Sequence, residues 1–178
     1  PLVCKALGGT VETVEAPRAA RQYQHAVQFR NLTSERVDGI ARWGGNGGGV
    51  NLDFSGEPSA TVGDWLREKY PHHHSPSRMD VCEDLVGPGL FDALFEFGRD
   101  LAQRSSPRIQ INRQGDWDDL ERGRTVEFGS RESVSQLVIY EKGLQLIGKG
   151  IDAPRDHVRI EHRIRPDKAL RQIGRAHV

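Results

Sequence analysis

Two aspartates lie on one face of a short segment near the middle of the chain. The stretch SRMDVCEDL covers residues 77 to 85 and alternates with the period of two that a β-strand imposes. One face carries Arg78, Asp80, Cys82 and Asp84. Carboxylates this close repel each other and raise each other's pKa unless a cation lies between them. That cation is Arg78, a basic neighbouring strand or a metal ion, and this segment alone does not decide among the three.

Two later segments carry further polar faces. QLVIYEK places Gln136, Val138, Tyr140 and Lys142 on one face, and HVRIEHRIR places His157, Arg159, Glu161, Arg163 and Arg165 on one face. If these faces adjoin, carboxylates suited to Mg²⁺ or Mn²⁺ meet a tyrosine that can attack a phosphodiester and arginines that can hold phosphates. Mixed charges on a sheet more often form only a solvated network of ion pairs, so the chemistry needs further support.

Composition sets the class of protein. The 178 residues are 36% hydrophobic and 28% charged, which fits one polar soluble domain. No run of about 18 apolar residues predicts a membrane span. The two cysteines, Cys4 and Cys82, lack a C-x-x-C partner and favour a reducing compartment, so we expect a cytoplasmic protein. The formal net charge of zero means that any nucleic-acid surface must be a local patch.

The hydrophobic pattern predicts an α+β fold of two layers, with a mainly antiparallel β-sheet and helices packed on one face. Strands are expected at 21–30, 50–54, 77–85, 124–130, 136–143 and 157–165, and helices at 59–70, 87–106 and 167–172. The helix within 87–106 has the clearest apolar stripe, formed by Leu90, Leu94, Phe97 and Leu101. The histidines at 72–74 lie between two prolines, which favours a surface loop over a metal site.

Three motifs in order resemble those of the replication initiation factor family, which includes filamentous-phage initiators and Rep_trans-type plasmid rolling-circle Rep proteins. The matching residues are Arg78, Asp80 and Asp84, then Thr125, Gly129, Ser130, Arg131 and Ser133 with Tyr140, Glu141, Lys142 and Gly143, and last Arg159 and Glu161. The resemblance covers residues 20 to 171. Two positions depart from the pattern: Glu127 replaces the tyrosine of T-x-Y-x-G, and Val138 replaces an arginine.

The resemblance implies a rolling-circle initiator that nicks and rejoins origin DNA through a tyrosine-linked 5′-phosphate. Tyr140 is then the nucleophile, and Lys142 lowers its pKa. The expected ligands of Mg²⁺ or Mn²⁺ are Asp80, Asp84 and Glu161, and the expected DNA-binding residues are Arg78, Arg131, Arg159 and Arg163. The expected partner is single-stranded or origin DNA, with a host helicase and a second copy of the chain as further candidates and no membrane.

Two other functions stay open. If the family's nucleophile is the tyrosine that Glu127 replaces, the chain is a non-catalytic DNA-binding relative; a small RNA-binding domain is the second alternative. The expected organisation is an N-terminal lead-in of a fragment at 1–20, a C-terminally truncated catalytic domain at 21–171 and an adapter-derived tail at 172–178.

Overall fold

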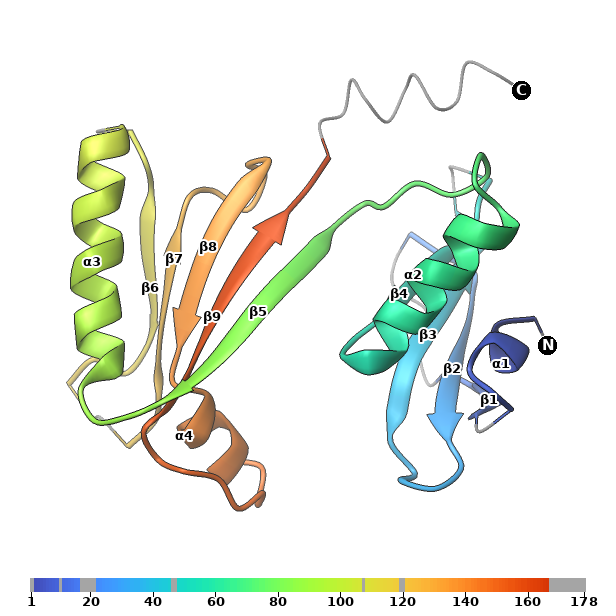
Figure 1. Ribbon diagram of the computed structural model, residues 1–178, viewed down its shortest axis with the longest axis horizontal. Helices are drawn as coiled ribbons and strands as arrows, with labels where there is room; N and C mark the ends of the chain where they lie inside the picture. Colours follow the sequence, from blue (N-terminus) through green and yellow to red (C-terminus); the bar gives the residue numbers. More distant parts are fainter. Residues whose placement is uncertain are drawn as a thin grey trace. The chain divides into compact units, whose positions relative to one another are not determined.

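The structure is a computed structural model that describes residues 2–9, 11–16, 22–45, 48–106, 108–118 and 121–166 (Figure 1). It divides into two compact units, Pro1–His74 and Ser75–Val178. Each unit has its own antiparallel sheet with helices, which confirms the predicted α+β class but distributes the strands over two sheets. The boundaries predicted for the catalytic domain stay a prediction, and the helix expected at 167–172 lies outside the described residues.

The first unit is a four-stranded sheet in the order β1-β2-β3-β4. Its elements are α1 (Leu2–Ala6), β1 (Val11–Glu15), β2 (His25–Asn31), β3 (Val37–Trp43), β4 (Asn51–Phe54) and α2 (Glu57–Lys69). Val11, Phe29 and Ala41 form the buried core on one face of this sheet. A proline in the first turn of α2 favours the start of that helix, where its missing N–H has no helical acceptor to lose.

The second unit is a five-stranded antiparallel sheet in the order β5-β9-β8-β7-β6 (Figure 1). Its elements are β5 (Met79–Val86), α3 (Leu90–Ser105), β6 (Ile111–Gly115), β7 (Arg124–Phe128), β8 (Ser135–Tyr140), α4 (Lys142–Ile147) and β9 (His157–Ile164). The long helix α3 packs against β7 and β8. The core between them contains Phe91, Phe95, Ala102, Val126, Phe128, Ile139 and Val158. Among the described residues, no helix is both long and apolar enough to cross a bilayer.

The buried face of α3 is only partly the predicted one, because Leu90 and Leu94 pack against the core but the other two residues of the stripe do not. Phe97 is 63% exposed and Leu101 is 48% exposed, although both belong to the most regular apolar stripe. The helix instead buries Phe91, Phe95, Gly98 and Ala102. A Cβ on Gly98 would lie 2.8 Å from the ring of Phe128, so this glycine lets the helix approach the sheet closely. Close approach through small residues therefore outweighs the burial of two larger side chains.

Most predicted elements are confirmed, and the missed ones have weak patterns. The expected strands correspond to β2, β4, β5, β7, β8 and β9, and two expected helices correspond to α2 and α3. The sequence did not predict α1, β1, β3, β6 or α4. β6 has the sequence INRQG, whose mostly exposed polar side chains hide the alternation that identifies a strand.

Candidate functional site

The register of the second sheet brings the three polar segments together. β9 lies between β5 and β8. Side chains directly opposite one another on neighbouring strands share a face. The resulting rows are Asp84, Arg159 and Tyr140, then Cys82, Glu161 and Val138, and last Asp80, Arg163 and Gln136. We call this surface the polar face; α3 packs on the opposite face with Val126 and Ile139. The three segments whose contact the sequence left open therefore adjoin.

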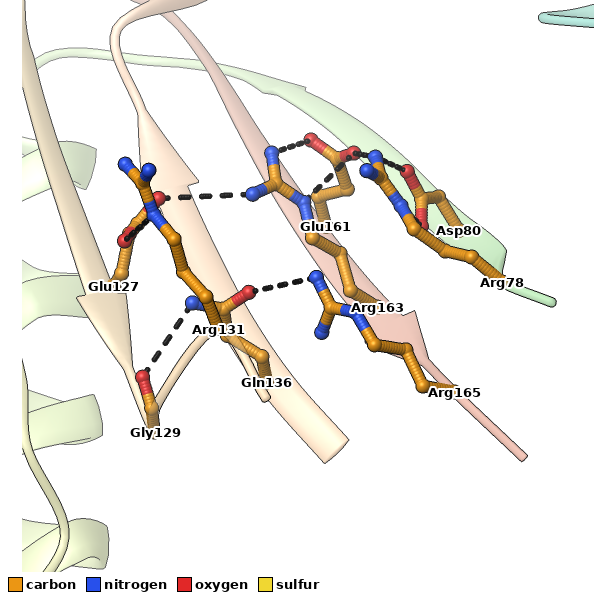
Figure 2. Close-up of polar contacts among 9 residues, drawn as sticks. All are labelled: Arg78, Asp80, Glu127, Gly129, Arg131, Gln136, Glu161, Arg163 and Arg165. Atoms are coloured by element: carbon orange, nitrogen blue, oxygen red, sulfur yellow. Dashed lines mark hydrogen bonds and ion pairs between the residues drawn. The ribbon is translucent and has the colours of Figure 1, made fainter. Parts of the chain in front are cut away.

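Asp80 and Glu161 form the acidic pair of the polar face. Arg78 Nε donates a hydrogen bond of 2.6 Å to Asp80 Oδ1, and Arg163 Nε lies 3.3 Å from Glu161 Oε1 (Figure 2). Partial burial raises the pKa of Asp80, but hydrogen bonds with Arg78 and Glu161 and the charges of nearby arginines together hold this pKa below its ordinary value. The cations that accompany the acids in the structure are thus arginines.

Asp84 belongs to a different cluster from the acidic pair. Its two oxygens accept hydrogen bonds of 2.7 and 2.6 Å from Nε and Nη2 of Arg159. His157 Nε2 lies 2.9 Å from Asp84 Oδ1. The hydrogen bonds from Arg159 are the main cause that lowers the pKa of Asp84 to about 2. Asp84 is therefore an ionised partner of Arg159, and its role as a metal ligand stays a prediction.

The donor set fits a divalent cation with few protein ligands. Among the described residues, no group of three or more histidines, cysteines, aspartates or glutamates is arranged to hold a metal. Asp80 and Glu161 nevertheless flank one guanidinium, because Arg78 pairs with Asp80 and its Nη2 lies 4.0 Å from Glu161 Oε1. Mg²⁺ in phosphate chemistry commonly takes one or two carboxylates and fills its remaining positions with water and substrate oxygens. These two carboxylates match that pattern.

Tyr140 lies at the end of β8, half-buried beside Arg159. Burial is the main cause that raises the pKa of Tyr140 above 10, and the charge and hydrogen bond of Arg159 oppose this shift. Lys142 Nζ lies 5.7 Å from the centre of the Tyr140 ring and donates a hydrogen bond to Gln145. Arg159 is directly opposite Tyr140 in the register, and its charge lowers the pKa of the phenol, while the role of Lys142 stays a prediction. The predicted contact of Arg159 with DNA stays a prediction.

Glu141 and Gly143, which follow Tyr140, are fixed by contacts with other segments of the second unit. Glu141 accepts hydrogen bonds from Arg124, including one of 2.9 Å from Nη2 to Oε1. The same guanidinium lies 4.3 Å from the centre of the Phe91 ring, so it joins the sheet to α3. A Cβ on Gly143 would lie 2.0 Å from the carbonyl oxygen of Pro154, so only glycine fits there. These contacts fix the start of α4 next to Tyr140.

The remaining arginines surround a buried glutamate. Glu127 is 5% exposed, and its carboxylate lies 3.6 Å from Arg163 Nη1 and 3.8 Å from Arg131 Nε (Figure 2). Gln136 is 1% exposed and its amide donates to the carbonyl oxygen of Gly129. Val138, which stands where the family pattern has arginine, is buried beneath this layer. The structure pairs both Arg131 and Arg163 with Glu127, and their contact with DNA stays a prediction.

The histidine segment 72–74 lies in a loop, as predicted. Nδ1 of His74 lies 2.7 Å from the carbonyl oxygen of Tyr70, which ties one of the three rings to the end of α2.

Comparison with known proteins finds a likeness in fold. The chain is similar to the structure of a rolling circle replication initiator protein from Geobacillus stearothermophilus, with a TM-score of 0.58 and 19% sequence identity. The match covers 99% of this chain and 70% of that chain. No family model matches the sequence, and no curated protein sequence matches it. The chain thus shares its fold with that initiator.

Proposed function

We propose that this chain initiates rolling-circle replication by nicking and rejoining single-stranded origin DNA, with Tyr140 as the nucleophile. The observation that carries the proposal is the polar face itself, where Glu161 lies one row along the sheet from the half-buried Tyr140 and Asp80 lies one row further. The likeness in fold to a replication initiator supports the same function.

The proposed step is a transesterification. The phenol oxygen of Tyr140 attacks a phosphorus atom, the P–O3′ bond breaks, and a 5′-phosphotyrosine forms while the 3′-oxygen leaves with a proton. Arg159 donates to the phenol oxygen and favours its ionised form, while Asp84 holds the guanidinium in place through two hydrogen bonds. Rejoining is the reverse reaction, so no nucleotide cofactor is required.

A divalent ion completes the proposed site. Asp80 and Glu161 would hold Mg²⁺ or Mn²⁺, which when bound supplies a positive charge to the phosphoryl oxygens. Asp84 is the third ligand that the sequence suggested, and it would have to leave Arg159 to take that role. Arg78 and Arg163, which pair with the acids, would remain beside the phosphates and hold the strand.

The test uses the three tyrosines of the chain, Tyr23, Tyr70 and Tyr140. Protein is incubated with Mn²⁺ and labelled single-stranded DNA from its own replicon, and a covalent protein–DNA adduct is sought on a denaturing gel. We expect Tyr140→Phe to abolish the adduct, because no other group at this position can form a phosphotyrosine. Tyr23→Phe and Tyr70→Phe are the matched controls and should retain it.

The same gel tests the main alternative, a DNA-binding relative without catalysis. Glu127 favours that alternative, because it stands where the family pattern has a tyrosine and is buried on the polar face. Tight binding of DNA without any adduct would establish it. An adduct that survives in Tyr140→Phe would move the nucleophile to another residue.

A further inference from the structure

A recess opens on the polar face at the edge strand β6. Its volume is about 560 Å³, and its lining consists of Gln110, Asn112, Arg113, Gln114, Glu127 and Arg131. Asn112 is directly opposite Glu127 in the register of β6 and β7, and Gln114 is opposite Thr125, so both amides share the polar face with Glu127. The recess therefore combines exposed amide groups, a guanidinium and one buried carboxylate.

The carboxylate of Glu127 has hydrogen-bonding capacity that the fold leaves unused. Its Oε2 is buried and has no hydrogen-bond donor among the described residues. The nearest guanidinium nitrogens of Arg163 and Arg131 lie at 3.6 and 3.8 Å, which compensates charge but is too long for a hydrogen bond. A buried acceptor without a donor is unfavourable, so a ligand that brings N–H groups to this oxygen gains affinity.

Arg131 is the exposed neighbour of this carboxylate. Its guanidinium lies beside Glu127 in Figure 2, and its side chain is 73% exposed. An exposed side chain held by one long ion pair is readily displaced, because such pairs contribute about 1 kcal/mol or less. Arg131 can therefore move aside and still donate hydrogen bonds to a ligand that contacts Glu127.

The chemistry of these groups selects one nucleobase. Guanine presents two adjacent donors, N1–H and N2–H, on its Watson–Crick edge, and these match the two oxygens of a carboxylate. The other bases each place an acceptor beside their donor, and a carboxylate repels that acceptor. Guanine also offers O6 and N7, the acceptors that an arginine most often contacts. Unpaired bases in single strands are recognised in this way, through the edges that pairing would otherwise occupy.

We propose that the recess binds one unpaired guanine of the DNA strand, with Glu127 accepting from N1–H and N2–H and Arg131 donating to O6 or N7. The inference rests on the proposed binding of single-stranded DNA. Tyr140 is opposite Thr125, and Glu127 is two residues further along β7, so the two side chains are diagonal neighbours. Such neighbours are about 7–8 Å apart. A guanine held by Glu127 would thus be adjacent to the bond that Tyr140 attacks and would define the cleavage position.

The experiment measures binding rather than cleavage. Fluorescence anisotropy compares a thymine-only oligonucleotide with versions that carry one central guanine, hypoxanthine, adenine or cytosine. Guanine should strengthen binding by about tenfold over adenine and cytosine, since one bidentate contact discriminates by that order. Hypoxanthine lacks the N2 amino group and should lose most of the gain. Glu127→Gln should remove the preference for guanine and leave the affinity for thymine-only DNA at or above that of the wild type.

The matched control is Glu132→Gln, which makes the same charge change on an exposed neighbour and should keep the guanine preference. Equal binding of all oligonucleotides by the wild type would overturn the inference and leave the nicking proposal intact. A guanine preference without a Tyr140-dependent adduct would support the inference and overturn the nicking proposal. If no oligonucleotide binds, titration with guanosine monophosphate observed by NMR decides: shifts that Glu127→Gln abolishes support the recess, and their absence overturns it.

Discussion

Arg159 lies between two acidic groups of different strength, the carboxyl of Asp84 and the phenol of Tyr140. It forms both of its short hydrogen bonds with the stronger acid, Asp84, which raises the pKa of the guanidinium further. The charge of Arg159 also lowers the pKa of the phenol, but burial has the larger effect and keeps this pKa above its ordinary value of 10. The proposed nucleophile therefore rests in its neutral form near pH 7, and we expect its reactivity to rise as the pH approaches that pKa.

The ion pair of Asp84 makes stability depend on pH. Its folded-state pKa of about 2 lies below the ordinary value of 3.8, so its contribution is present above about pH 4 and is lost as the pH falls through 2. Because the side chain is 41% exposed, solvent screening reduces this contribution to about 1 kcal/mol. Wild type should exceed Asp84→Asn by that free energy of unfolding at pH 6, and the difference should shrink toward pH 2.

Urea unfolding followed by circular dichroism in EDTA measures this difference at each pH. Asp152→Asn serves as the control, because Asp152 is exposed, and it should match the wild type throughout. A stability difference for Asp84→Asn that is as large at pH 2 as at pH 6 would contradict the role assigned to the ion pair.

The residues of the site show what a single sequence can and cannot predict. Alternation within β5, β8 and β9 correctly placed Asp80, Tyr140 and Glu161 on faces of their own strands, because the side-chain period of a strand is fixed. Strand order and register depend on contacts between distant segments, and the sequence pattern does not contain them. For this reason the pairing of Arg159 with Asp84 and the burial of Glu127 became visible only in the structure.

At the scale of one element, α3 provides a direct test of which face is buried. Phe95 is 7% exposed in the core, whereas Phe97 is 63% exposed two residues later. Phe95→Ala should lower the free energy of unfolding by about 3–5 kcal/mol, because it removes a large side chain and leaves a cavity. Phe97→Ala should cost less than about 1 kcal/mol, as surface substitutions do. Thermal or urea unfolding of the two variants measures both values, and equal losses would show that the predicted stripe is buried after all.

At the scale of the whole molecule, the charge is balanced but not evenly placed. The formal net charge is zero, so the chain has no global attraction for a polyanion. The polar face of the second unit nevertheless collects Arg78, Arg131 and Arg163 around its acids. The proposed binding of DNA is therefore expected to be local, through a small number of phosphates. The salt dependence of the binding constant measures how many phosphates are contacted.

Each phosphate contact with a single strand contributes about −0.7 to the slope of log K against log salt concentration. Three or four arginine contacts predict a slope between about −2 and −3 for a thymine-only oligonucleotide. Arg78 is 48% exposed, and an exposed pair with Asp80 is weak enough to share the guanidinium with a phosphate. Arg78→Gln should therefore bring the slope closer to zero by about 0.7, whereas Arg36→Gln, at an exposed position of the first unit, should leave it unchanged. An equal change of the slope for both substitutions would mean that DNA is attracted by the overall charge of the protein. It would contradict the assignment of the polar face as the binding surface.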